Sequence, residues 1–85
     1  MPSWKPVRLE REVMQMAVLP SDSGEYEVGS RYGSSDEDGY LALLRGDTVC
    51  WDQRPSDPRS VGVSDTGDVV VADWIKYGES TGATI

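Results

Sequence analysis

An internal repeat constrains the fold of this chain more than any other feature of its sequence. Shifting the sequence by 43 residues aligns residues 18–42 with residues 61–85 without a gap. The identical pairs in this alignment are Val18/Val61, Ser21/Ser64, Asp22/Asp65, Gly24/Gly67, Val28/Val71 and Gly39/Gly82. Because a chain of 85 residues forms at most one small domain, we expect residues 1–85 to be a single domain built from two copies of one unit.

Each copy has the pattern of a strand, a tight turn and a second strand. In the second copy, Asp65-Thr66-Gly67-Asp68 separates the apolar residues 61–63 from the apolar residues 69–71. A glycine in a turn that is flanked by β-branched residues predicts a β-hairpin. Asp22 and Asp65 occupy equivalent turn positions, where an aspartate side chain can accept hydrogen bonds from the turn backbone. We therefore assign both aspartates a structural role.

The repeat and the prolines set the boundaries of the two units. Unit 1 spans about residues 13–54 and contains about four short strands, and a connector with two prolines, residues 52–58, follows them. Unit 2 spans about residues 58–85 and is incomplete, because its third strand would begin at Gly82–Ile85. Residues 1–12 form an N-terminal segment for which the repeat predicts nothing. Residues 13–19 fit both helical and strand spacing, and the repeat register favours a strand.

The segment Pro58–Asp73 resembles the repeat of NHL-type β-propellers, and a unit of about 43 residues with four strands resembles one propeller blade, as in WD-type repeats. In the NHL family a proline precedes a short apolar strand, a turn with glycine follows, and a second strand ends in Val-Ala-Asp, here residues 71–73. The resemblance weakens over residues 16–30, where Gly29-Ser30 replaces Ala-Asp. It implies an all-β fold of antiparallel hairpins and sheets of the blade type. The alternative is a small β-barrel or sandwich.

The same resemblance implies a binding platform, usually for proteins. A propeller needs at least about four blades to close a ring, and this chain supplies barely two. Either the chain is a fragment of a longer protein, or several copies assemble, or it is not a propeller. An open pair of small sheets leaves edges and apolar faces uncovered, so we expect a partner surface.

Charge and composition exclude several classes of function. The chain carries 15 acidic and 8 basic residues, for a net charge of -7, which argues against nucleic-acid binding because phosphate contacts need clustered lysine and arginine. Acid-rich composition with only two lysines, Lys5 and Lys76, resembles the halophilic proteins of salt-accumulating haloarchaeal cytoplasm. No apolar run approaches the roughly 20 residues of a membrane helix, and residues 1–6 lack the apolar stretch of a signal peptide. We therefore expect a cytoplasmic protein without membrane contact.

The residues that usually carry chemistry are nearly absent. With no histidine and only Cys50, the chain cannot form serine–histidine or cysteine–histidine catalytic sites, or the usual structural zinc sites. Residues 34–39 end like a calcium-binding loop, with Asp36 and Asp38 as weak candidate ligands. Ser34 and Arg45, however, stand at the first and twelfth loop positions, where calcium loops carry acids. A solvated acidic loop is the simpler interpretation, and we expect no cofactor.

Aromatic residues with a polar group are enriched at protein interfaces, and the predicted function is based on such residues. Our candidate interface residues are Trp51, Trp74, Ile75 and Tyr77. The prediction is a non-enzymatic protein-interaction or self-assembly module that buries sheet faces and strand edges against a protein partner, with a second copy of the chain in a homo-oligomer as one such partner. The alternative is a cation-binding domain that uses its acidic loop, or a fragment of a larger propeller enzyme.

Overall fold

The computed structural model describes residues 3–9, 12–33, 38–55, 58–72 and 75–79, and within them it contains strands and no helix. All strand pairings are antiparallel, which confirms the all-β, antiparallel prediction. The strands are β1 (Ser3–Arg8), β2 (Val13–Pro20), β3 (Glu27–Arg31), β4 (Tyr40–Arg45), β5 (Thr48–Gln53), β6 (Gly62–Val63), β7 (Val69–Val71) and β8 (Ile75–Tyr77).

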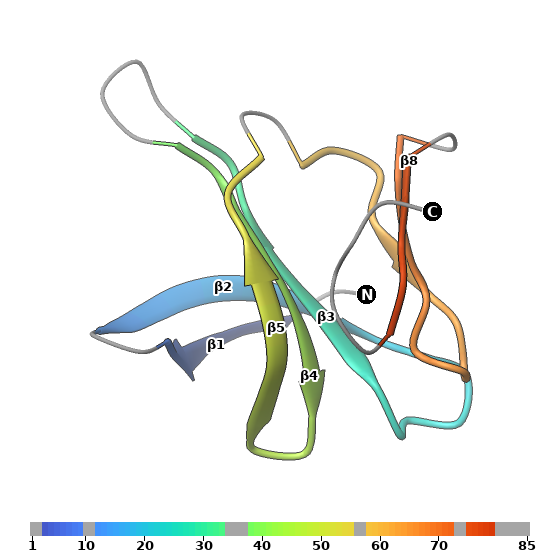
Figure 1. The fold of residues 1–85 in the computed structure, drawn as a ribbon. Coiled ribbons are helices and arrows are strands. Elements are labelled where there is room, and N and C mark those ends of the chain that lie inside the picture. The colour runs from blue at the N-terminus through green and yellow to red at the C-terminus, as the bar shows by residue number, and fades with distance from the viewer. Residues whose placement is uncertain (1–2, 10–11, 34–37, 56–57, 73–74, 80–85) are drawn as a thin grey trace.

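The strands form two sheets in which each strand pairs with its neighbour in the sequence. β1 to β5 make a five-stranded sheet in the order β1-β2-β3-β4-β5, and β6 to β8 make a three-stranded sheet in the order β6-β7-β8. Figure 1 shows β6 to β8 lying beside the long strands β3 to β5, while β1 and β2 cross behind them. No pairing among the described residues joins β5 to β1, so the five-stranded sheet is open rather than a closed barrel.

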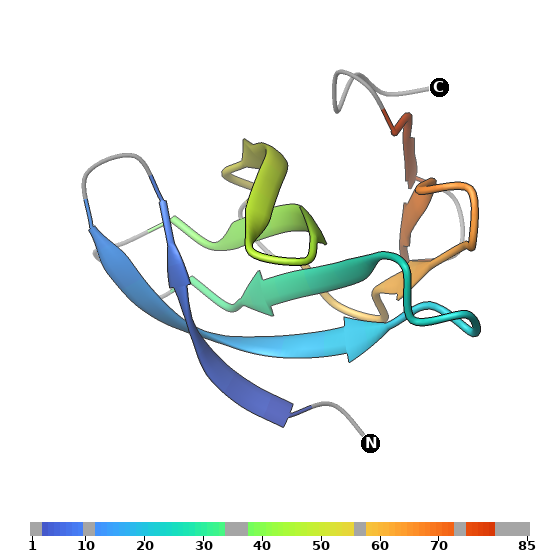
Figure 2. The ribbon, with the colours of Figure 1, turned by 90° about the horizontal axis from the view of Figure 1, so that it is seen from below.

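The long strand β2 bends the five-stranded sheet back on itself, as Figure 2 shows. Val7, Met14 and Met16 point to the inside of this curl and meet Ala42 and Leu44 of β4. Successive side chains of a strand point to opposite faces, so the alternation of buried and exposed residues along β2 follows from one buried face. The first core cluster is Val7, Leu9, Met14, Met16, Val18, Ala42 and Leu44.

The other face of β3 to β5 packs against the three-stranded sheet. This second core cluster is Tyr26, Val28, Leu41, Leu43, Trp51, Val69 and Val71. β4 lies between the two clusters, because Leu41 and Leu43 point into the second and Ala42 and Leu44 into the first. A strand with both faces buried has a continuous apolar sequence, and residues 41–44 (Leu-Ala-Leu-Leu) have that sequence.

Two strands differ from the sequence predictions. β1 lies in the N-terminal segment for which the repeat predicted nothing, and it pairs with β2 along its whole length. The third strand of the second sheet is β8, which begins at Ile75, whereas the repeat placed a third strand at residues 82–85, outside the described residues. The chain leaves the repeat register at Ala72, whose φ of 53° lies in the left-handed region and directs the backbone away from β7.

The two equivalent turns have nearly the same backbone structure. Gly24 and Gly67 have φ angles of 79° and 85°, which glycine adopts without steric cost. Each glycine N–H donates to the carbonyl of the serine three residues earlier, Ser21 or Ser64, at 3.0 Å. Each of these serine hydroxyls accepts a backbone N–H at the end of its turn, from Tyr26 at 3.3 Å or from Asp68 at 3.0 Å. The sequence repeat at these two turns therefore corresponds to a repeat of their backbone structure.

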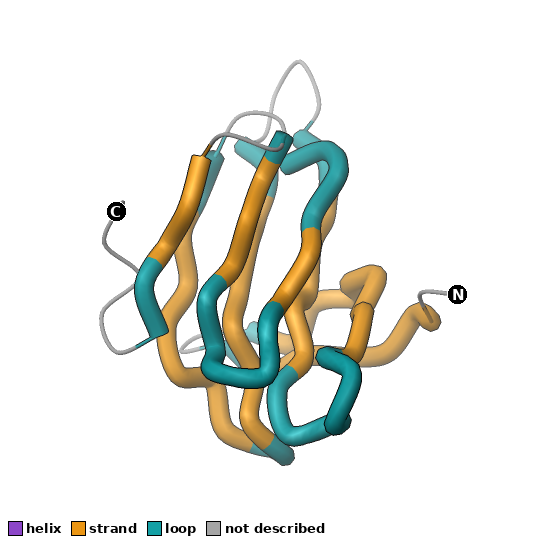
Figure 3. Tube along the Cα trace, turned by 90° about the vertical axis from the view of Figure 1, so that its right-hand side faces the viewer, coloured by secondary structure: helices purple, strands orange, loops and turns teal. Residues whose placement is uncertain are grey.

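Asp65 joins these two turns. Its carboxylate accepts a hydrogen bond from the Ser23 backbone N–H at 2.8 Å, across the contact between the two sheets. Figure 3 shows the two turns side by side at the same end of the molecule. Asp65 therefore caps the neighbouring turn, whereas the sequence pattern predicts that it caps the turn in which it lies. Hydrogen bonds from the backbone and side chain of Ser23 lower the pKa of Asp65 below its usual 3.8.

We predict that Leu43→Ala lowers the free energy of unfolding by about 2–5 kcal/mol, because it leaves a cavity beside a fully buried strand. Urea denaturation followed by circular dichroism measures this change. The control, Thr48→Ala at an exposed position of β5, should change the stability by less than about 0.5 kcal/mol. Equal effects of the two substitutions would show that β4 is not the centre of the core.

We also predict that the Asp65 contact makes stability depend on pH. Because the pKa of Asp65 is lower in the folded chain than in the unfolded chain, its contribution is present above the unfolded value and is lost as pH falls through the folded value. Asp65→Asn should therefore be less stable than the wild type at pH 7, and the difference should shrink below about pH 4. Thermal denaturation between pH 2 and pH 7 measures this difference, and a loss of stability in Asp65→Asn that is the same at every pH would contradict it.

Candidate interaction surface

The outer face of the β1–β2 hairpin is exposed and partly apolar. In this hairpin Trp4 lies opposite Ala17, Pro6 opposite Gln15, and Arg8 opposite Val13. Opposite residues of an antiparallel pair share a face, and this face is the reverse of the one that carries the buried Val7 and Met14. We call Trp4, Pro6, Arg8, Val13, Gln15 and Ala17 the outer hairpin face.

Two large apolar side chains are exposed on this face. Trp4 is 69% exposed and Val13 is 58% exposed, and neither belongs to a core cluster. Tyr32, just after β3, is the third such residue among the described ones. A single exposed hydrophobic residue is ordinary, but a tryptophan and a valine on one hairpin face, with Pro6 between them, form a surface suited to protein contact.

Both edges of the five-stranded sheet disfavour pairing with another strand. Pro6 in β1 has no backbone N–H to donate to an added strand, and proline in a sheet is typical of edge positions. In β5, Leu43 pairs with Trp51 and Leu44 with Val49, so Cys50 is an extra residue and forms a β-bulge. Such features protect edges from aggregation. The face of the hairpin, rather than a strand edge, is thus the more accessible surface for a partner.

The structure brings three of the four predicted interface residues together, but inside the molecule. Trp51 is only 7% exposed and lies in the second core cluster, where its ring centroid is 5.5 Å from that of Tyr77. Ile75 and Tyr77 are half-buried against the same cluster. Trp51 is therefore a core residue between the two sheets, which corrects its prediction as a surface anchor. The fourth residue, Trp74, lies outside the described residues.

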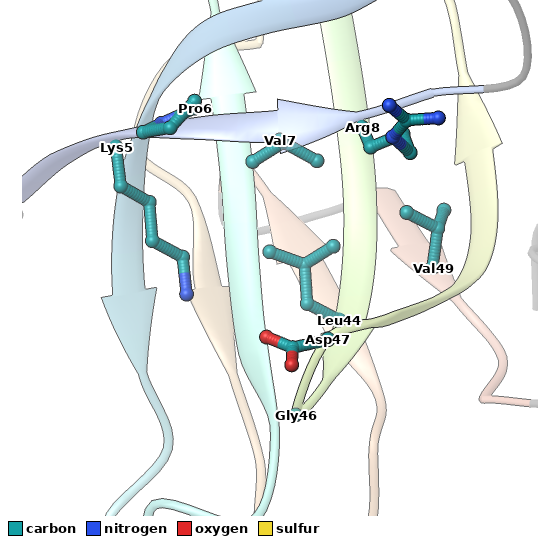
Figure 4. Close-up of a pocket in the computed structure, with 8 residues that line it drawn as sticks. All are labelled: Lys5, Pro6, Val7, Arg8, Leu44, Gly46, Asp47 and Val49. Carbon is teal, nitrogen blue, oxygen red and sulfur yellow. The ribbon is translucent and has the colours of Figure 1, made fainter.

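A small pocket lies on the inner side of the hairpin, where β1 crosses β4 and the β4–β5 turn. It has a volume of ≈ 280 Å³. Figure 4 shows Val7 and Leu44 pointing toward each other across it, with Lys5 to one side and Asp47 below. The Lys5 ammonium already forms an ion pair with Glu27 at 2.8 Å. The pocket thus has an apolar floor and a lysine whose charge is balanced by a neighbour.

Charged groups near the turns interact through Tyr26. Burial of the Tyr26 ring raises its pKa above 10.0, and the negative charge of Glu79 raises it further. The Arg45 guanidinium lies over this ring, 5.4 Å from its centroid, and forms an ion pair with Glu25 at 2.7 Å. The Tyr26 phenol raises the pKa of Arg45, and the hydrogen bond and negative charge of Glu25 raise it as well. These contacts hold the ends of β3 and β4 together and provide no acid–base pair.

No metal or catalytic centre stands out in the part of the chain that the structure describes. Asp38 is exposed, and Asp36 lies outside the described residues. Within the described residues, no three histidine, cysteine, aspartate or glutamate side chains lie close enough to hold a metal ion. The same residues include no helix of the length and apolarity that a bilayer span requires.

Comparison with known proteins adds no functional assignment: no protein-family model, curated protein or solved structure matches this chain.

Sequence reasoning missed the outer hairpin face. It had found no strand in residues 1–12, and so Trp4 and Val13 were not candidates. A partial signal was present in residues 13–18, where Met14, Met16 and Val18 fall at alternate positions, as one face of a strand would. This spacing does not show which residues of the reverse face stay exposed until β1 is paired. The pairing of β1 with β2 then shows which residues share the exposed face.

We predict that Trp51→Ala lowers the free energy of unfolding by about 3–5 kcal/mol, as expected for a large aromatic residue removed from a core. Urea denaturation measures this loss. Tyr32→Ala, which removes an exposed aromatic residue, is the control and should change stability by less than about 0.5 kcal/mol. If Trp51→Ala left the stability unchanged, Trp51 would be a surface anchor after all.

Proposed function

We propose that this chain is a non-enzymatic protein-interaction or self-assembly module that binds its partner through the outer hairpin face. The observation that carries the proposal is the exposure of Trp4 and Val13 on one face of the β1–β2 hairpin, on the side turned away from the core. Burial of a tryptophan in an interface contributes more to affinity than most other residues. The protected edges of β1 and β5 support a contact made by a face.

The partner in this proposal is a protein, and a second copy of the chain is its simplest form. The uninterrupted antiparallel order of β2, β3, β4 and β5 is compatible with a four-stranded unit of the propeller-blade kind, to which β1 adds a fifth strand. Assembly of several copies would supply the blades that one chain lacks. Because the net charge is -7, copies repel each other at low salt, and screening at high salt reduces this repulsion.

Light scattering after gel filtration, in about 1 M and about 0.1 M salt, tests the proposal. We expect a concentration-dependent oligomer that is favoured at high salt. The double variant Trp4→Ser/Val13→Ser should weaken association by about 30-fold or more, the loss expected for an interface hot spot. Tyr32→Ser is the control for an exposed aromatic residue outside the hairpin and should associate like the wild type.

Two results would contradict this proposal. A monomer at both salt concentrations, up to the highest soluble concentration, would exclude self-assembly. An oligomer whose association is the same in the double variant and in the wild type would exclude the outer hairpin face as the interface. Circular dichroism of each variant establishes that the strand content is retained.

A further inference from the structure

A second pocket lies at the other end of the five-stranded sheet, away from the two joined turns. It forms where β2 begins, β3 ends, β4 begins and β5 ends, and it has a volume of ≈ 270 Å³. Ends of curled sheets are frequent positions of ligand sites. The lining residues are Glu12, Met14, Arg31, Asp38, Tyr40 and Arg54.

Tyr40 lies between two arginines in this pocket. Arg31 on β3 is its direct partner across the β3–β4 pairing. The guanidinium of Arg54, just beyond β5, lies over the Tyr40 ring, 5.4 Å from the ring centroid. A guanidinium that stacks on an aromatic ring is held in position by the ring and keeps its N–H groups available at its edge.

Arg54 makes no ion pair with a described residue, although Glu12 and Asp38 line the same pocket. The chain has 15 acidic and 8 basic residues, and two acidic residues line the same pocket as Arg54. Carboxylates that could form an ion pair with Arg54 are therefore present nearby. The Arg54 guanidinium instead lies over the Tyr40 ring, and the side chain is exposed.

We propose that this pocket binds a carboxylate group through Arg54. The planar guanidinium matches a carboxylate in a two-bond arrangement. The two acidic residues balance the two arginines, so the lining tolerates one added negative charge better than two, and a monoanionic carboxylate fits better than a phosphate dianion. Because the exposed lining of the pocket is mostly polar, the ligand class is a small organic carboxylate with few carbon atoms. This inference is independent of the proposed function.

Nuclear magnetic resonance titration of the ¹⁵N-labelled chain tests it, with sodium acetate and inorganic phosphate as probes at constant ionic strength. We expect saturable shifts of the Arg54 Nε–H and Tyr40 amide signals with acetate, and weaker binding of phosphate. Arg54→Gln should reduce acetate affinity at least tenfold. Arg54→Lys should retain part of it, because it keeps the charge and loses the planar pair of donors. Arg59→Gln, which lies outside the pocket, should bind acetate like the wild type.

The titrations also define what would overturn the inference. Non-saturable shifts with acetate, tighter binding of phosphate than of acetate, or equal acetate affinity of Arg54→Gln and the wild type would each do so. Because Arg54 is exposed, its substitution leaves the core intact, and an unchanged ¹⁵N spectrum outside the pocket verifies this for each variant.

Discussion

The burial of β4 on both faces is the constraint on which the rest of the structure depends. Leu41 and Leu43 contact the three-stranded sheet, and Ala42 and Leu44 contact the curled β1–β2 hairpin. A chain of this length buries only roughly two thirds of its unfolded surface. Because β4 contributes one face to each cluster, this short chain can form both clusters. Both outer layers are present because β4 has two apolar faces to cover.

The two outer layers are held by different interactions. The hairpin layer is continuous with the sheet through the bend of β2, so its position follows from backbone pairing. Among the residues that the structure describes, the three-stranded layer has no backbone pairing to the larger sheet. It depends on side-chain packing around Trp51 and Val69 and on the hydrogen bond between Ser23 and Asp65. Substitutions at these residues therefore act first on the attachment of the smaller sheet.

The two candidate sites follow from what this layering leaves uncovered. One face of the hairpin covers β4, so its reverse, with Trp4 and Val13, is left exposed. The end of the curl where β3 stops and β4 starts is open, and there Tyr40 and Arg54 line a pocket of mixed charge. We propose a protein as the partner of the first site and a small carboxylate as the ligand of the second, and the two sites lie on different sides of the hairpin layer.

Local patterns in the sequence were enough for the all-β class, the strand over residues 13–19 and the two glycine-containing turns, because glycine conformation and the alternation of side chains along a strand act over a few residues. The tertiary structure decided the rest. It paired β1 with β2, turned the chain at Ala72 before the repeat predicted, moved Trp51 into the core and directed Asp65 to Ser23. Each of these outcomes depends on which segments meet in space, and residues far apart in the chain carry no local signal of their contact.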